Sequence, residues 1–273
     1  MPKPETAIPK PPSALLMALE GRALVEWAAA MLAWPLLRSS PKGDGHPVLV
    51  LPGLLAGDAS TALLRRYLKR AGFESHPWGL GRNLGPADDT IERLAERVHR
   101  LAARSGRKVS LVGWSMGGAL AHGLAQAIPE RVRSVITLGS PLAGHPHQTN
   151  AWRLFERVSG LTADAPELLE RMGQPARVPT TAILSKSDGI VHWHCSMVPV
   201  GENAESIEVD ASHFGLGVHP AVLWIIAERL AQPEGEWHPF RRDGAWKRLL
   251  YRDPRRLRID GLASRGVKDH PVD

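Results

Sequence analysis

The segment Lys108–Gln126, KVSLVGWSMGGALAHGLAQ, constrains the fold of this chain more than any other stretch. It opens with an apolar run of strand character and closes with a helical pattern, and Ser115 stands between them among glycines. Glycines on both sides of one serine are typical of a sharp strand-to-helix turn, where larger side chains would collide with neighbouring elements. We therefore predict a strand, a tight turn that carries Ser115, and a helix that begins at Met116.

Short apolar runs alternate with helical patterns along the rest of the chain. The predicted strands are 47–53, 73–78, 108–114, 132–140, 180–188 and 205–213, and helical patterns cover 61–70, 89–103 and 219–230. This alternation predicts an α/β fold with a mostly parallel central sheet covered by helices on both faces.

Residues 141–179 break that alternation with polar, proline-bearing sequence. Short helical pieces are expected at Trp152–Val158 and Pro166–Met172. We predict that this insert forms a small helical cap or lid over the carboxyl ends of the strands.

Length and composition favour one principal domain. The chain has 273 residues, of which 43% are hydrophobic, and the predicted core spans 46–232 between an N-terminal extension, 1–45, and a basic C-terminal extension, 233–273. The lone cysteine, Cys195, excludes an intrachain disulfide and fits a reducing compartment. Charged residues interrupt the first apolar segment, so we expect no cleaved leader, no transmembrane helix and a cytoplasmic location.

An apolar stripe at helical spacing runs through the N-terminal extension. Its members are Leu15, Leu16, Leu19, Ala23, Leu24, Trp27, Met31 and Trp34. We interpret it as a helix docked on the core, with a membrane-surface or lid helix as the alternative because two tryptophans suit an interface.

Positive charge gathers near the C-terminus. The formal net charge is +6, and residues 241–258 hold eight basic against two acidic side chains, together with Trp246 and Tyr251. This segment is either a solvated extension or a surface for anionic lipid or another polyanion. No recognised nucleic-acid module accompanies the charge, so nucleic-acid binding is not expected.

The turn at Ser115 has the pattern of a nucleophile elbow. Gly113 to Gly117 reads G-x-S-x-G, and a serine used in this way needs a histidine base and a carboxylate that orients the base. In elbow folds the acid and then the histidine follow the serine along the chain. His213 follows the last predicted strand and precedes the last helix, and it is the predicted base.

Other histidines have ordinary interpretations. His219 precedes Pro220 at a helix start and suits a cap, and His122 lies inside the helix after the elbow. His192 and His194 flank Trp193 without a third ligand nearby, so they are expected to line a pocket and not to bind a metal.

Asp188 is the predicted acid, because it ends the strand 180–188 and precedes a glycine. Asp164 in the insert is the second candidate, and Asp210 is too close to His213 along the chain. The backbone N–H groups of Leu54, after Pro52-Gly53, and of Met116 are the predicted oxyanion donors. Apolar side chains are expected to line the substrate pocket around the serine. They are Leu55, Trp114, Leu142 and Trp193.

Five motifs in order, LPGLLAG, GWSMGG, TLGSPLAG, SKSDGIV and SHFGL, resemble the α/β-hydrolase superfamily and its esterase and lipase branch. The resemblance covers residues 47–230. It departs from many lipases in having Pro-Gly where His-Gly is common and Trp114 where histidine is frequent.

The resemblance implies a serine hydrolase that acts on small-molecule carboxylic esters with hydrophobic acyl chains, without metal or organic cofactor. An acyltransferase or thioesterase would use the same three residues, and a non-catalytic binding protein would keep only the fold. The N-terminal helix and the basic tail would suit peripheral contact with a membrane.

Overall fold

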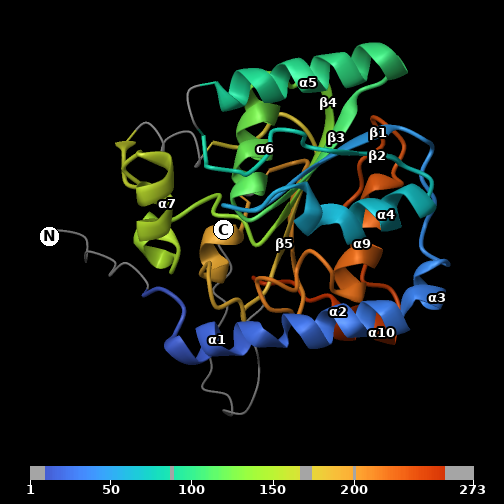
Figure 1. Cartoon of the computed structure of the whole chain (residues 1–273). Coiled ribbons are helices and arrows are strands. Elements are labelled where there is room, and N and C mark those ends of the chain that lie inside the picture. The colour runs from blue at the N-terminus through green and yellow to red at the C-terminus, as the bar shows by residue number, and fades with distance from the viewer. Residues whose placement is uncertain (1–9, 87–88, 167–173, 199–200, 256–273) are drawn as a thin grey trace, which may run out of the picture.

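The computed structural model describes residues 10–86, 89–166, 174–198 and 201–255. At the centre of the described chain is a six-stranded sheet with the order β2-β1-β3-β4-β5-β6, in which all neighbouring strands are parallel (Figure 1). The strands are β1 Pro47–Leu51, β2 Glu74–Pro77, β3 Val109–Trp114, β4 Val132–Leu138, β5 Thr180–Leu184 and β6 Ala204–Glu208. The predicted fold class is confirmed.

Helices cover both faces of the sheet because side chains of successive strand residues point to opposite faces. Leu49 and Leu51 pack with α5, Thr90–Ser105, and α6, Met116–Ala127. Val48 and Val50 pack in a second core on the other face. That core contains side chains of α4, Ala62–Arg70, and α9, Pro220–Leu230.

Strand order reverses between β1 and β3. From β1 the chain moves outward to β2, and from β3 onward it moves to the opposite edge. In open parallel sheets, ligands bind outside the carboxyl ends of the strands at such a reversal, because the loops diverge there. The loops after Leu51 and Trp114 leave the sheet at this point, since Leu51 is in register with Gly113.

The N-terminal extension forms a chain of short helices, α1 Ala14–Ala18, η1 Leu19–Arg22, α2 Ala23–Leu32 and α3 Trp34–Leu37 (Figure 1). Most of its predicted apolar stripe does not dock on the core. Leu24 is 77% exposed and Trp27 is 50% exposed, whereas Glu20, Glu26 and Ala30 are buried. The inward side instead meets loops whose backbone N–H groups need acceptors, which favours carboxylates there.

The described part of the predicted C-terminal extension packs on the fold. Phe240 and Tyr251 are buried in the core beside α9, and the Tyr251 hydroxyl donates to the carbonyl of Ala221 at 3.0 Å. Arg252 exchanges two backbone hydrogen bonds with Glu208 of β6. Helix α10, Ala245–Leu250, lies between Phe240 and Tyr251 in the sequence. Residues 256–273 of this segment lie outside the described residues.

Residues 141–179, which we call the cap segment, contain η3 Pro146–Gln148 and α7 Trp152–Ser159. The second predicted helical piece, Pro166–Met172, falls almost wholly outside the described residues. The remaining short helices are η2 Asp58–Thr61 and η4 Trp193–Ser196. In the described ranges, every helix is too short or too polar to cross a bilayer.

Candidate active site

Ser115 occupies a single-residue corner between β3 and α6. Its backbone has φ 53° and ψ −123°, in a region that non-glycine residues rarely adopt. The Ser115 N–H donates to the carbonyl of Leu138 at 2.8 Å, which fixes the corner to the end of β4. Strain of this kind persists only where surrounding structure enforces it, and it is concentrated at functional sites.

Glycines beside the corner are required by close backbone approach. A Cβ on Gly113 would overlap the carbonyl of Gly117, and a Cβ on Gly117 would overlap the carbonyl of Pro52. The loop after β1 therefore lies directly against the start of α6. This contact places Leu54 and Met116 on neighbouring segments.

Asp188 and His213 form a buried pair beyond the ends of β5 and β6. The His213 Nδ1 lies 2.7 Å from Asp188 Oδ2, and each residue is 3% exposed. The other oxygen, Asp188 Oδ1, accepts the N–H groups of Ile190 and Val191, each at 2.8 Å. The carboxylate is thereby held in one orientation and can hold the imidazole with Nε2 away from it.

The competing acids do not contact His213. Asp164 is exposed in the cap segment, and Asp210 accepts a hydrogen bond from the Ser187 hydroxyl at 2.9 Å. His219 caps α9, where its Nδ1 accepts the N–H of Ala221 at 3.2 Å. Among these candidates, the structure thus brings Asp188 and His213 together.

The charge environment of His213 favours its protonated form. Burial alone lowers the pKa of His213, but the charge and hydrogen bond of Asp188, with the charge of Glu20, raise it above its ordinary value. A base with a raised pKa accepts a proton more readily. It must still be neutral to act, so it works best above that pKa.

Glu20 and Glu26, in the N-terminal helices, bind the loops that carry Asp188 and His213. Glu20 Oε1 accepts the N–H groups of Gly189 at 2.8 Å and His213 at 2.9 Å, and Oε2 accepts that of Phe214 at 3.0 Å. Glu26 accepts both the N–H and the hydroxyl of Ser212. Sequence reasoning missed both residues. The available signal was the presence of two carboxylates within an otherwise apolar helical segment.

The loop after β1 lies against the corner, where a Cβ on Gly53 would be 3.4 Å from Ser115 Cβ. Among the hydrogen bonds of the described residues, the N–H groups of Leu54 and Met116 have no acceptor. Leu55 has φ 61°, and its N–H donates to the Asn83 carbonyl at 2.7 Å. The buried Asn83 also donates from Nδ2 to the Pro52 carbonyl at 2.8 Å, so it braces this loop. No sequence pattern indicated this role for Asn83.

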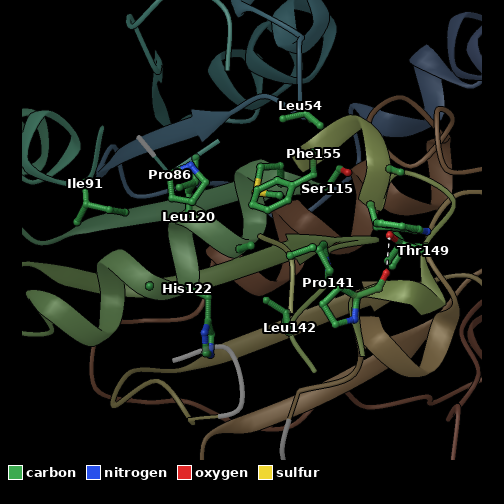
Figure 2. Close-up of a pocket in the computed structure, with 18 of the residues that line it drawn as sticks. Leu54, Pro86, Ile91, Ser115, Leu120, His122, Pro141, Leu142, Thr149 and Phe155 are labelled. Carbon is green, nitrogen blue, oxygen red and sulfur yellow. Dashed lines mark hydrogen bonds between the residues drawn. The ribbon is translucent and has the colours of Figure 1, made fainter. Parts of the chain in front are cut away.

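A cavity of about 500 Å³ opens beside Ser115 between α6 and the cap segment (Figure 2). Figure 2 shows Leu54 and Ser115 toward one side of it, and Ile91 and His122 toward the other. Most of its lining is apolar and comes from α6 and the cap segment. These residues include Met116, Ala119, Leu120, Gly123, Ala127, Pro141, Leu142, Trp152, Phe155 and Ala163.

Of the predicted pocket side chains, Leu142 lines this cavity and three others do not. The Trp114 indole turns to the opposite side of the corner, where its Nε1 donates to the carbonyl of His213 at 3.0 Å. The Trp193 ring lies tilted against that of His194, with 3.8 Å between ring centres, and Lys186 Nζ is 4.7 Å from the Trp193 ring centre. Leu55 is 38% exposed on the bent loop. These three residues do not line this cavity, and their part in a substrate pocket stays a prediction.

A second Ser-His-Asp arrangement lies at the opposite edge of the sheet. His46 Nδ1 is 2.6 Å from Asp44 Oδ1, and His46 Nε2 is 2.9 Å from Ser110 Oγ. Both His46 and Ser110 are fully buried at the amino ends of β1 and β3. Burial, opposed by the Asp44 hydrogen bond, lowers the pKa of His46 to about 4. With no access for a substrate, this arrangement is a structural hydrogen-bond chain.

Comparison with known proteins identifies a family whose sequence model matches part of the chain. A sequence model of the family described as alpha/beta hydrolase fold matches residues 47–165. This chain has the α/β-hydrolase fold. The matched segment includes Ser115 and ends before Asp188 and His213. No curated protein matches the chain.

Solved structures of three lipases share the fold of this chain. Aspergillus fumigatus lipase B has 16% identity and a TM-score of 0.52 over 72% of this chain, which spans 55% of that protein. Paleococcus ferrophilus monoacylglycerol lipase has 16% identity and a TM-score of 0.51, with 69% of this chain and 96% of that protein covered. A Bacillus licheniformis lipase has 18% identity and a TM-score of 0.51, with 71% and 95% covered. At these identities the likeness concerns the fold alone.

Proposed function

We propose that this protein is a serine esterase or lipase that cleaves carboxylic esters of hydrophobic acyl chains. The observation that carries the proposal is the buried Asp188–His213 pair, 2.7 Å apart, at the sheet edge where the β3–α6 corner holds Ser115. Ser115 is the nucleophile, His213 the base and Asp188 the residue that orients the base.

Each step uses groups already described. His213 Nε2 takes the proton of the Ser115 hydroxyl while Oγ bonds to the ester carbonyl carbon, and the carbonyl oxygen becomes an oxyanion. The N–H groups of Leu54 and Met116 donate to that oxyanion, and Met116 also lies at the N-terminus of α6, where the helix dipole favours negative charge. The carbon–oxygen bond to the alcohol then breaks, and the alcohol leaves with the proton from His213.

The second half of the reaction frees the acid. His213 removes a proton from water, whose oxygen attacks the acyl-enzyme carbonyl. The bond to Ser115 Oγ then breaks, and Oγ recovers the proton from His213. A protonated Asp188 is not required, because its charge stabilises the imidazolium formed in each half.

Cavity shape supports an extended apolar acyl chain. Cavity-lining residues of α6 run from Met116 to Ala127, and at 1.5 Å rise per residue this face is about 16 Å long. Apart from His122 and Gln126, the α6 residues along that length are apolar, and each buried methylene contributes about 0.8 kcal/mol to binding. A long acyl chain is therefore favoured over a short one.

Two measurements test the proposal. A fluorophosphonate probe should label the wild-type protein once and should not label Ser115→Ala, while Ser110→Ala, which removes the buried serine of the second arrangement, should still be labelled. Rates on p-nitrophenyl esters from acetate to palmitate should rise toward the long chains. Full ester hydrolysis by a folded Ser115→Ala protein would refute the proposal. Products formed with added alcohols or with acyl thioesters separate an esterase from an acyltransferase and a thioesterase.

A further inference from the structure

The outer side of α1 to α3 is a surface of large apolar side chains. We call it the N-terminal apolar face. Leu32 is 84% exposed, Leu24 is 77% exposed and Trp27 is 50% exposed. Its members are Leu15, Leu19, Leu24, Val25, Trp27, Met31, Leu32 and Leu36. A contiguous exposed apolar surface of this kind marks an interaction site, whereas single exposed leucines do not.

Charged groups in this segment are withdrawn from the N-terminal apolar face. Between residues 11 and 37 the charged side chains are Glu20, Arg22 and Glu26. Both glutamates are buried, and Arg22 donates to the Ser187 hydroxyl at 2.7 Å and to Glu26 at 3.1 Å. The outward surface is therefore uncharged along the whole helical chain.

Both ends of the N-terminal apolar face carry exposed cations. Lys10 lies before α1, and Arg38 and Lys42 follow α3. The acid nearest to Arg38 and Lys42 along the chain, Asp44, is already paired with Arg107 and Arg133. An apolar surface with cationic ends complements a surface that is apolar beneath a layer of negative charge.

A second exposed apolar surface lies on α10, beside α9. In α10, Trp246 is 47% exposed and Leu249 is 70% exposed, beside the cations Lys247 and Arg248. Trp246 packs edge-on against Trp224 of α9 with 5.7 Å between ring centres, and α2 and α3 also contact α9. Figure 1 shows α2, α3 and α10 at the same end of the molecule.

We propose that the N-terminal apolar face docks on the surface of an anionic phospholipid bilayer, with α1 to α3 lying along that surface. Leucines and Trp27 would enter the boundary between headgroups and acyl chains, and Lys10, Arg38 and Lys42 would contact lipid phosphates. A second copy of the chain is a poorer occupant. Because both ends of the face are cationic, a parallel or an antiparallel contact between copies places like charges together.

Docking would bring the bilayer beside the cavity. Asn150, in the cap segment, donates from Nδ2 to the carbonyl of Pro12 at 3.0 Å, just before α1. The inner side of the same helices holds the loops of Asp188 and His213 through Glu20. A lipid ester leaving the bilayer would therefore have a short path to the cap segment.

Vesicle flotation of the full chain tests this docking without depending on catalysis. The Ser115→Ala protein is mixed with vesicles of phosphatidylcholine alone or of phosphatidylcholine with phosphatidylglycerol, so that no lipid is consumed. We expect binding to the mixed vesicles. Leu24→Glu with Leu32→Glu should weaken it by more than about tenfold, since each buried leucine contributes several-fold or more to the affinity. Leu84→Glu, at a 48% exposed leucine between β2 and α5, is the matched control and should bind normally.

A second variant separates charge from apolar contact. Lys10→Gln with Arg38→Gln and Lys42→Gln should reduce the preference for phosphatidylglycerol and leave the oligomeric state unchanged. Flotation that is absent in the parent protein, or equal in the parent and the leucine double variant, would overturn the proposal. So would gel filtration showing a dimer that becomes a monomer in the leucine double variant, because a second copy would then cover the face.

Discussion

The carboxylate of Glu20 accepts the backbone N–H of His213 at 2.9 Å, across 193 residues of sequence. The same carboxylate accepts the N–H of Gly189, the residue after Asp188. One side chain from outside the segment matched by the family model therefore joins the loop of the acid to the loop of the base. Its burial and full hydrogen bonding give it a positioning role at the site.

Glu20→Gln should shift the pH profile of the reaction. Loss of the negative charge removes one of the interactions that raise the pKa of His213, so the acid limb of kcat/KM should move to lower pH. Three N–H donors cannot all be satisfied by one amide oxygen, so kcat should also fall and the protein should lose about 1–3 kcal/mol of stability. The measurement is a pH series of ester hydrolysis with chemical denaturation alongside.

Glu26→Gln is the matched control for this shift. It also breaks buried hydrogen bonds from the same helices, to Ser212, but Glu26 is not among the charges that raise the pKa of His213. We expect a similar loss of stability and an acid limb at its wild-type position. An acid limb of kcat/KM at the same pH in the wild type and in both variants would show that Glu20 acts on the fold and not on the pKa of His213.

Asp188→Asn should cost about 10⁴-fold in kcat, because an amide at that position no longer fixes the working tautomer of the imidazole or stabilises its charged form. The protein should stay folded, since the side chain keeps its shape. Steady-state kinetics should be run beside Asp164→Asn, which alters the exposed alternative acid and should retain normal activity. A larger loss in the Asp164 variant would reassign the acid.

Gly139→Ala should disturb the acid–base pair directly. Gly139 has φ 54°, and a Cβ there would lie 2.9 Å from Asp188 Oδ2 and 3.1 Å from His213 Nδ1. Positive φ alone costs a non-glycine residue about 1–2 kcal/mol, and the overlap should add to that and lower kcat.

Gly106→Ala measures the backbone cost without the overlap. Gly106 ends α5 at φ 67°, and a Cβ there would have no other atom within 4 Å, so this variant should lose stability but not activity. Urea unfolding and ester kinetics on both proteins give the comparison. Identical kinetics in the two variants would show that a Cβ at position 139 does not displace Asp188 or His213.

Stability should fall as pH drops from about 6.5 toward 4. Burial lowers the pKa of His122 to about 4, and the pKa of His46 is lowered to the same value. Between those pH values the unfolded chain binds protons that the folded chain excludes, so the free energy of unfolding rises with pH. Each histidine contributes at most about 3 kcal/mol. His213, whose pKa is raised, contributes stability that is fully present in this range and is lost only as pH rises above about 6.5.

His122→Leu isolates one of these contributions. Nε2 of His122 is buried without a hydrogen-bond partner among the described residues, so a leucine there should raise stability and flatten its dependence on pH in this range. Denaturant unfolding at neutral pH and near pH 5 gives both quantities. An unchanged pH slope would show that His122 is not the titrating group.

Much of the scaffold follows from local sequence. Strand alternation places the elements, and Ser115 stands at the corner where the glycine spacing predicts it, because backbone crowding at such a turn leaves a local signature. The carboxyl ends of parallel strands lie at one edge of the sheet, so residues that follow late strands are the best candidates for the acid and the base. Asp188 and His213 meet this condition in the expected order. Their catalytic roles stay a prediction until the variants are measured.

Other features were decided by tertiary structure alone. An apolar stripe shows that a helix has two sides, but not which side meets the core. The outcome here depended on the free N–H groups of loops near Gly189 and Ser212, 169 and 186 residues away from their glutamates, which carboxylates could satisfy. In the same way, the backbone bend at the corner turned Trp114 away from the cavity and left α6 to line it. Sequence spacing determines which residues neighbour one another along an element, whereas the direction in which an element faces depends on distant groups that it packs against.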